Sequence, residues 1–268
     1  MDDEQTQAFW TGLRSFTQAR IGLGRAGDAL PTRRVLEFAA AHAAARDAVH
    51  TPLDVPVLSA RLAELGIGEP MHIASRARDR AEYLRRPDLG RLPAGEPGTG
   101  SGSSEQALPH SGAEIGLVLA DGLSARALAE HGPPTVAALL EVLRPRCSIA
   151  PPVVATQARV ALGDHIGAAL GVSTVLVLIG ERPGLSVADS LGVYLTHLPR
   201  PGRTDADRNC VSNIHPPEGL GYRRAAEVIA TLVAGALLLG RSGVGLKDTS
   251  RDAMLTGPSG ELPENETG

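Results

Sequence analysis

The sequence predicts an α/β protein with a Rossmann-like, doubly wound and mostly parallel sheet, preceded by a mainly helical N-terminal region. Residues 174–179 form a continuous apolar run rich in β-branched side chains, which is typical of a central strand covered on both faces. From residue 115 onward such runs alternate with helical patterns, as expected for parallel strands joined by helices. Aromatic residues make up only 3% of the chain, so small aliphatic side chains must build closely packed helix-on-sheet layers.

The first 92 residues are expected to be mainly helical. Apolar periodicity predicts an amphipathic helix within residues 6–20. Capping and stop residues then predict helices at 32–50 and 54–65, with a short strand following at 71–74. The arginine-rich segment 85–91 is expected to form a charged turn, which is either a solvated loop or a contact for an anion or another subunit.

A glycine-rich segment between the first two helices matches the dinucleotide-binding pattern G-x-G-x-x-G at Gly22, Gly24 and Gly27. That fingerprint must follow a strand and open a helix, whereas this one follows a helical pattern. Asp47, which has the right spacing to bind a ribose, also lies inside a helical pattern. We therefore interpret the segment as a turn between helices, and a nicotinamide-dependent oxidoreductase stays an alternative function.

The segment 93–113 divides the chain by its composition. Gly, Ser and Pro dominate it, which predicts a flexible loop. It separates the helical region 1–92 from an α/β domain at 114–250, and a polar tail at 251–268 is expected to fray.

The α/β domain is expected to alternate strands with helices. Its predicted strands are 115–120, 149–155, 174–179 and 190–196. Its predicted helices are 124–131, 135–143, 164–170 and 222–239. Pro133 and Pro134 are expected to separate the first two of these helices, because proline removes a helical hydrogen bond and clashes with the preceding turn. The polar segment 198–215 is expected to be a long functional loop.

The composition excludes several classes of protein. The net charge is −4, the isoelectric point is about 6.1 and no basic run occurs, so nucleic-acid binding is not expected. No apolar stretch is long enough to span a bilayer and the acidic N-terminus leads into no secretory signal, so a cytoplasmic location is expected. Cys147 and Cys210 show no metal-ligand spacing, which predicts free thiols in a reducing compartment.

The turn at 180–184 follows the predicted central strand and carries Glu181 and Arg182. Ligands of open α/β sheets bind outside the carboxyl ends of the strands, so these two side chains are candidates for a site. Alternatively, they cap a neighbouring helix or pair with each other. Cys210 lies close to Arg208, whose charge could lower the pKa of the thiol toward a reactive thiolate. The alternative is a small thiol that only packs in a pocket wall.

No self-sufficient catalytic set is visible in the sequence. It contains no G-x-S-x-G, H-E-x-x-H or G-x-x-x-x-G-K-[ST] pattern, and its histidines are scattered. Neither a metal site nor a catalytic residue is therefore predicted on this chain, and a non-catalytic α/β interaction module is a further alternative.

Four segments, taken together and in order, resemble the small (light) subunit of ethanolamine ammonia-lyase. They are R-R-P-D-L-G-R at 85–91, A-D-G-L-S at 120–124, G-E-R-P-G-L at 180–185 and D-R-N-C-V-S-N-I-H at 207–215. Each motif is modest alone, and four in sequence make the match specific. The resemblance covers about residues 12–250.

The resemblance implies a role in an adenosylcobalamin-dependent radical lyase that converts ethanolamine into acetaldehyde and ammonia. A large partner subunit, a TIM barrel, would hold the substrate and any catalytic residues. In this chain, the region 1–92 would contact the large subunit and the domain 114–250 would cover the cobalamin. The assembly would contain several copies of each subunit. Cobalamin contacts of the family map onto Val160, Glu181 and Cys210 of this sequence.

Relatives from bacteria that form microcompartments carry an extra N-terminal amphipathic helix and linker. In this sequence the family-like region begins near Thr11, so a location outside any shell compartment is expected. The sequence also lacks an Asp-x-His-x-x-Gly motif, so it does not support a histidine ligand to cobalt.

Overall fold

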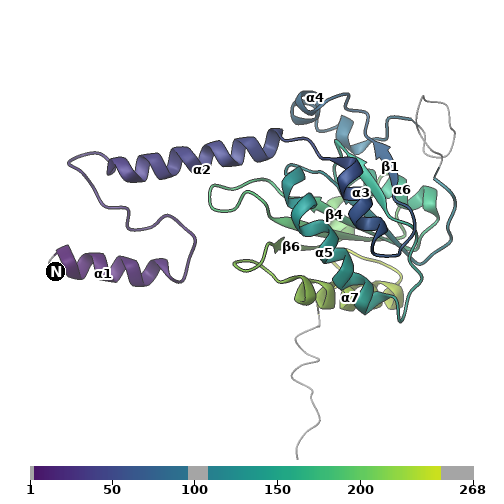
Figure 1. Ribbon diagram of the computed structural model, residues 1–268. Helices are drawn as coiled ribbons and strands as arrows, with labels where there is room; N and C mark the ends of the chain where they lie inside the picture. The colour runs from purple at the N-terminus through teal and green to yellow at the C-terminus, as the bar shows by residue number, and fades with distance from the viewer. Residues whose placement is uncertain (1–2, 96–107, 249–268) are drawn as a thin grey trace, which may run out of the picture.

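A computed structural model describes residues 3–95 and 108–248 of the chain (Figure 1). The strands are β1 (Met71–Ala74), β2 (Ile115–Ala120), β3 (Val153–Thr156), β4 (Thr174–Gly180), β5 (Leu191–His197) and β6 (Arg208–Ile214). The helices are α1 (Asp3–Arg14), α2 (Thr32–His50), α3 (Val55–Ala63), α4 (Arg80–Arg85), α5 (Ala125–Leu143), α6 (Leu162–Leu170) and α7 (Tyr222–Leu239). Two short 3-10 helices, η1 (Leu89–Arg91) and η2 (Asp205–Asp207), are also present.

The predicted α/β class is confirmed, and the strands form one sheet in the order β1-β3-β2-β4-β5-β6. The strands β1, β3, β2 and β4 are parallel to one another, whereas β5 is antiparallel to β4 and β6 is antiparallel to β5. The predicted mostly parallel sheet is therefore confirmed, although it is mixed at one side, whereas the Rossmann-like, doubly wound arrangement stays a prediction. The connection 181–190 is too short for the crossover that a parallel β5 would need, so the chain turns back as a hairpin.

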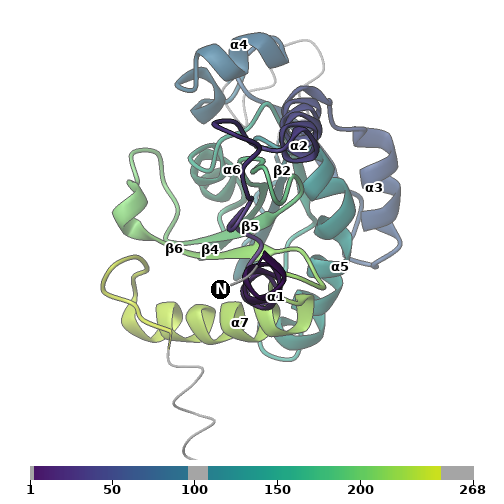
Figure 2. The same ribbon diagram turned by 90° about the vertical axis from the view of Figure 1, so that its left-hand side faces the viewer.

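The two faces of the sheet are buried by different helices, and β4 shows why its sequence is apolar throughout. Leu176 and Leu178 belong to the core shared with α3, α5 and α7. Val175 and Val177 alternate with them and belong to the core shared with α6. Figure 2 shows α7 and α6 on opposite sides of the sheet. A strand covered on both faces has no polar side, as the sequence predicted.

Helix α5 runs unbroken through Pro133 and Pro134, so the predicted division into two helices is wrong. Pro133 has no N–H group to donate to the carbonyl of Ala129, one turn earlier. The guanidinium of Arg61, on α3, donates a hydrogen bond to that carbonyl instead. The tertiary contact thus supplies one of the bonds that the prolines remove. Burial of α5 against the sheet stabilises the rest of the helix.

Other boundaries differ locally. The predicted helix 32–50 is confirmed as α2, with Pro31 at its N-cap, whereas α3 begins at Val55 and Asp54, predicted as its first residue, caps it. Helix α1 ends at Arg14, earlier than residue 20. The segment predicted as a charged turn at 85–91 contains the end of α4 and the helix η1.

The predicted polar loop at 198–215 is shorter than expected, because residues 208–214 form β6. Strand β3 begins at Val153, four residues later than predicted, since Pro151 and Pro152 precede it. Helix α6 begins at Leu162, two residues earlier than predicted.

The predicted flexible loop at 93–113 falls largely outside the described residues, which resume at 108. Leu108 is buried in the core beside α6, and the amide of Ser111 donates to the carbonyl of Leu170 at 2.8 Å. This end of the loop is therefore packed against the sheet. The predicted tail at 251–268 lies outside the described residues.

Residues 3–50, which we call the N-terminal arm, extend away from the sheet (Figure 1). The arm exposes large apolar side chains, including Phe16 at 88% and Leu36 at 64%. It contacts the turn after β4 through Arg20, whose guanidinium donates to the carbonyl of Leu185 at 2.9 Å. None of the helices that the structure describes has the length and hydropathy to cross a membrane.

Candidate functional site

The three residues predicted to contact a cofactor come from separate parts of the fold. Val160 lies in the turn between β3 and α6, Glu181 follows β4 directly, and Cys210 lies on β6. Tyr194 connects them: it is opposite Cys210 in the β5–β6 pairing and it lines one cavity together with Val160. Glu181 also acts electrostatically on both Tyr194 and Cys210. We call the surface that carries Tyr194 and Cys210 the β5–β6 face.

The β5–β6 face is open because α6 packs mainly on β2 and β4. Tyr194 is half-buried and Cys210 is exposed, although both belong to a sheet whose centre is buried. Tyr194 gave no signal in the sequence, since its role depends on the antiparallel register that places it opposite Cys210.

The carboxylate of Glu181 is held in one position by Ser190, the residue before β5, and by Asn213 of β6. Its Oε2 accepts hydrogen bonds from the hydroxyl of Ser190 at 2.5 Å and from the amide of Asn213 at 3.3 Å. Its Oε1 lies over Gly192, where a Cβ atom would come within 2.8 Å of it. Glu181 forms no ion pair with Arg182 within the described residues, so the interpretation of these two charges as a mutual pair is wrong.

The Cys210 thiol is protonated at neutral pH. Desolvation raises its pKa to about 11, the negative charge of Glu181 adds to this shift, and a hydrogen bond with Tyr194 opposes it. The hypothesis of a reactive thiolate is therefore wrong. Arg208 does not lower the pKa of the thiol because its guanidinium binds Asp164 instead.

The phenol of Tyr194 is protonated for similar reasons. Desolvation, followed by the neighbouring Cys210 and the charge of Glu181, raises the pKa of Tyr194 to about 12. The β5–β6 face therefore offers a neutral thiol and a neutral phenol beside one fixed carboxylate. Such a surface can both donate and accept hydrogen bonds.

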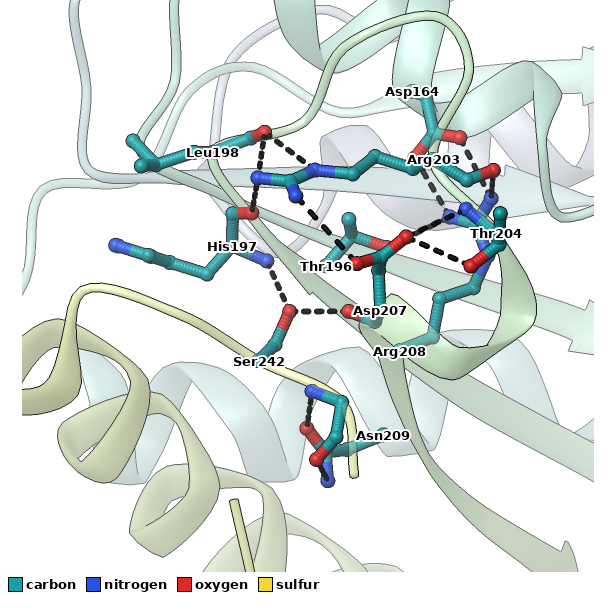
Figure 3. Close-up of polar contacts among 11 residues, drawn as sticks. Asp164, Thr196, His197, Leu198, Arg203, Thr204, Asp207, Arg208, Asn209 and Ser242 are labelled. Carbon is teal, nitrogen blue, oxygen red and sulfur yellow. Dashed lines mark hydrogen bonds and ion pairs between the residues drawn. The ribbon is translucent and has the colours of Figure 1, made fainter. Parts of the chain in front are cut away.

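A buried ion pair joins β6 to α6 beneath this face. Two nitrogens of Arg208 each donate to one oxygen of Asp164 at 2.7 Å, and both side chains are 2% exposed (Figure 3). Arg208 also donates to Thr196 at 2.9 Å and to the carbonyl of Arg203 at 3.0 Å. Burial raises the pKa of Asp164, although Arg208 acts in the opposite direction. The pair fixes the position of α6 relative to the hairpin.

Much of the polar segment 198–215 is structural. Arg203 donates to the carbonyls of His197 and Leu198, and the carboxylate of Asp207 accepts hydrogen bonds from Thr204 (Figure 3). Asn209 exchanges hydrogen bonds with the backbone of Gly243, where its amide also donates to Leu246 at 2.9 Å.

The turn that carries Val160 is supported from behind by Asp121. The carboxylate of Asp121, at the end of β2, accepts hydrogen bonds from the amides of Gln157 and Ala158 at 2.8 and 2.9 Å. Gln157 adopts a φ of 52°, a backbone angle that residues other than glycine rarely adopt, so the turn needs this support. The Tyr83 hydroxyl donates to the Ala158 carbonyl at 3.0 Å. In the sequence, Asp121 belongs to the motif A-D-G-L-S at 120–124, and its role in supporting this turn was not predicted.

A cavity of about 540 Å³ opens beside this turn. It is lined by Pro87, Arg91, Arg159, Val160, Ala161, Tyr194, Arg203, Thr204, Asp205 and Arg208. The segment predicted at 85–91 thus reaches the predicted site. A second cavity of about 630 Å³ lies between the N-terminal arm and the turn 185–189, and it includes none of the three predicted contact residues. We assign more weight to the smaller cavity because Val160 lines it together with Tyr194, which is opposite Cys210 in the β5–β6 pairing.

Comparisons with known proteins agree with the resemblance noted in the sequence. The family model described as ethanolamine ammonia-lyase light chain matches residues 7–247. The chain is 65% identical over 250 residues to the ethanolamine ammonia-lyase small subunit of Rhodococcus erythropolis, covering 93% of this chain and 94% of that protein. The corresponding subunits of Bradyrhizobium diazoefficiens and Ralstonia nicotianae are 50% identical over 254 residues and 49% identical over 251 residues. These two matches cover 94% and 93% of this chain, and 95% and 92% of the respective relatives.

Proposed function

This chain belongs to the ethanolamine ammonia-lyase light chain family, and on that premise we propose that it binds adenosylcobalamin at the β5–β6 face, through Val160, Glu181 and Cys210. Family membership makes it the small subunit of an ammonia-lyase with a large-subunit partner. The observation that carries the proposal is the carboxylate of Glu181, which Ser190 and Asn213 hold over Gly192.

The residues present fit a corrinoid. Cobalamin carries amide groups around its corrin rim and hydroxyl groups on its nucleotide tail, and a fixed carboxylate accepts hydrogen bonds from either kind of donor. Gly192 leaves the space that Oε1 of Glu181 occupies. The side-chain Nε of Arg159, beside Val160, is buried without a hydrogen-bond partner in the described residues, which also indicates that a polar ligand completes this region.

The proposed division of labour agrees with the prediction that the catalytic residues lie on the large subunit. Adenosylcobalamin supplies the radical chemistry by which ethanolamine becomes acetaldehyde and ammonia. A large subunit with a TIM-barrel fold holds the substrate, and several copies of both subunits assemble. Residues of this chain bind the cofactor, orient it and exclude water from one side of it.

The alternative of a nicotinamide-dependent enzyme has little support. Gly22, Gly24 and Gly27 lie between α1 and α2, and no strand precedes them in the described chain. Their positive φ angles suit a turn between helices. The alternative of a non-catalytic interaction module does not agree with membership of a lyase family.

The decisive experiment measures cobalamin binding by the complex of this chain with its large subunit. Glu181→Gln should weaken binding about ten- to a hundredfold, because a charge-assisted hydrogen bond contributes roughly 1.5–3 kcal/mol. Cys210→Ala should have a smaller effect, since a thiol is a weak hydrogen-bonding group. Glu64→Gln, which changes an exposed carboxylate after α3, is the matched control and should leave affinity unchanged. If Glu181→Gln lowers the melting temperature of the complex while affinity stays the same, the site is assigned wrongly.

A further inference from the structure

The cavity beside Val160 is unusually rich in arginine. Four arginines line it, against the single carboxylate of Asp205. Two of the four are already neutralised, because Arg208 binds Asp164 and Arg203 lies 3.6 Å from an oxygen of Asp207. Asp205 is 97% exposed and faces Arg208 at 3.5 Å. The carboxylates near the cavity are therefore associated with Arg203 and Arg208.

Arg159 and Arg91 supply the remaining positive charge. Neither side chain forms an ion pair or a hydrogen bond within the part of the chain that the structure describes. The guanidinium of Arg159 lies over the ring of Tyr83 at 4.3 Å, which orients the group without neutralising it. Its Nε is buried and has no partner. Arg91 lies at the end of η1 and is exposed.

Backbone donors point to the same ligand chemistry. Val160 and Ala161 line the cavity, and the backbone amide of neither residue donates a hydrogen bond to another described residue. Both precede α6, whose N-terminus has no side-chain cap. Free amides at a helix N-terminus and planar guanidinium groups both favour phosphate oxygens.

We propose that this cavity binds a phosphodiester group, through Arg159, Arg91 and the amides that begin α6. The inference rests on the proposed function, and it assigns to the cavity the phosphodiester that links the nucleotide tail of cobalamin to the corrin ring. Glu181 and Cys210 would then contact another part of the same molecule. The segment 85–91 thereby acts as an anion contact, one of the roles that its sequence suggested.

The test compares two corrinoids on the complex of this chain with its large subunit. Cyanocobalamin carries the phosphodiester, whereas dicyanocobinamide lacks the nucleotide tail and its phosphate. Affinities for both are measured by equilibrium dialysis with Arg159→Gln and Arg91→Gln, and inorganic phosphate is measured as a third ligand. Arg91→Gln is included because Arg91 is exposed, whereas Arg159 packs on Tyr83, so that its substitution also removes a packing contact. Arg146→Gln, an exposed arginine before β3, is the matched control.

Each arginine substitution should weaken cyanocobalamin binding about ten- to a hundredfold and change cobinamide binding less than about twofold. The control should change neither affinity. Equal losses for the two corrinoids would overturn the inference and leave the proposed function intact. Loss of inorganic phosphate binding alone, with cyanocobalamin unaffected, would assign the cavity to free phosphate and also overturn it. A wild-type complex that binds neither corrinoid would refute the proposed function, and the inference with it.

Discussion

At the scale of single residues, the β5–β6 face works through groups that stay neutral around one fixed charge. Glu181 is held by Ser190 and Asn213, and its charge helps to keep the Cys210 thiol and the Tyr194 phenol protonated. Neutral donors beside a fixed acceptor suit the binding of a large polar cofactor better than they suit nucleophilic catalysis.

The alkylation rate of Cys210 should report this environment. In a Cys147→Ser background, the rate of reaction with iodoacetamide should rise with pH around 11, where the pKa of Cys210 lies, instead of around the ordinary value of 9.0. Glu181→Gln should lower that midpoint, because it removes a nearby negative charge. A midpoint near 9 in the wild-type chain would show that the thiol is not shielded as described.

The same shift predicts the pH dependence of stability. The folded state raises the pKa of Cys210, so folding favours the protonated thiol. This contribution to the free energy of unfolding is fully present below pH 9 and is lost as the pH rises through 11.

At the scale of elements, α6 approaches the sheet closely because two of its residues are glycines. A Cβ atom on Gly163 would overlap with the Cγ2 of Val177 on β4, and one on Gly167 would come within 2.7 Å of Pro199. This close approach places the Val160 turn and Asp164 where they meet the hairpin. The position of the candidate site therefore depends on small residues far from any ligand.

Gly163→Ala should destabilise the chain by about 1–3 kcal/mol in urea unfolding, since an added methyl group overpacks this interface. The loss should shrink in the double variant with Val177→Ala, which makes room for the methyl group. Gly12→Ala on α1 is the control, because nothing lies within 4 Å of a Cβ there. An equal loss in the single and double variants would mean that the contact with Val177 does not limit the packing.

The comparison of sequence with structure is also most instructive at this scale. Periodicity and caps were sufficient to locate α2, α3, β2, β4 and α7, because local preference and burial agree in these elements. Where tertiary contacts decide the secondary structure, the prediction from sequence was wrong. Arg61 helps α5 to continue past Pro133, and pairing with β5 makes the polar residues 208–214 a strand. Local patterns contain neither contact.

The candidate site was only partly visible for the same reason. Glu181 follows β4, whose continuous apolar sequence identifies it as a buried strand, so the position of Glu181 could be predicted from the local pattern alone. Tyr194 and Arg159 become recognisable only when the sheet register and the stacking on Tyr83 are known. Cys210 was singled out in the sequence as a thiol near Arg208, whereas its role as a cofactor contact, like that of Val160, is predicted from the family resemblance.

At the scale of the whole molecule, the N-terminal arm is the part that lacks a core of its own. Phe16, Leu36 and Phe38 are exposed along it, at 88%, 64% and 49%. Exposed apolar side chains gathered on one projecting segment mark a surface for another protein. Membership of the family implies a large-subunit partner, and we propose that the arm contacts this partner.

Replacing Phe16 and Leu36 together by Ser should weaken assembly with the large subunit at least about tenfold, because each exposed side chain contributes roughly 1 kcal/mol or more when it is buried. Assembly is measured by analytical ultracentrifugation. The melting temperature of the isolated double variant serves as the control and should stay within a few degrees of wild type, since both positions are exposed. Normal assembly of this variant would assign the arm another partner.

The isolated wild-type chain should release no ammonia from ethanolamine with cofactor present.

The hydrogen bonds of Asn209 have a consequence for solubility. Strand β6 is the last strand of the sheet, so one side of its backbone has no neighbouring strand. Such edges pair readily with strands of other molecules and start aggregation. Here the residues after α7 fold back over the beginning of β6, where Asn209 binds Gly243 and Leu246 and the amide of Val244 donates to Ala206. The residues after α7 therefore cover the beginning of this edge strand, which should limit its pairing with strands of other molecules.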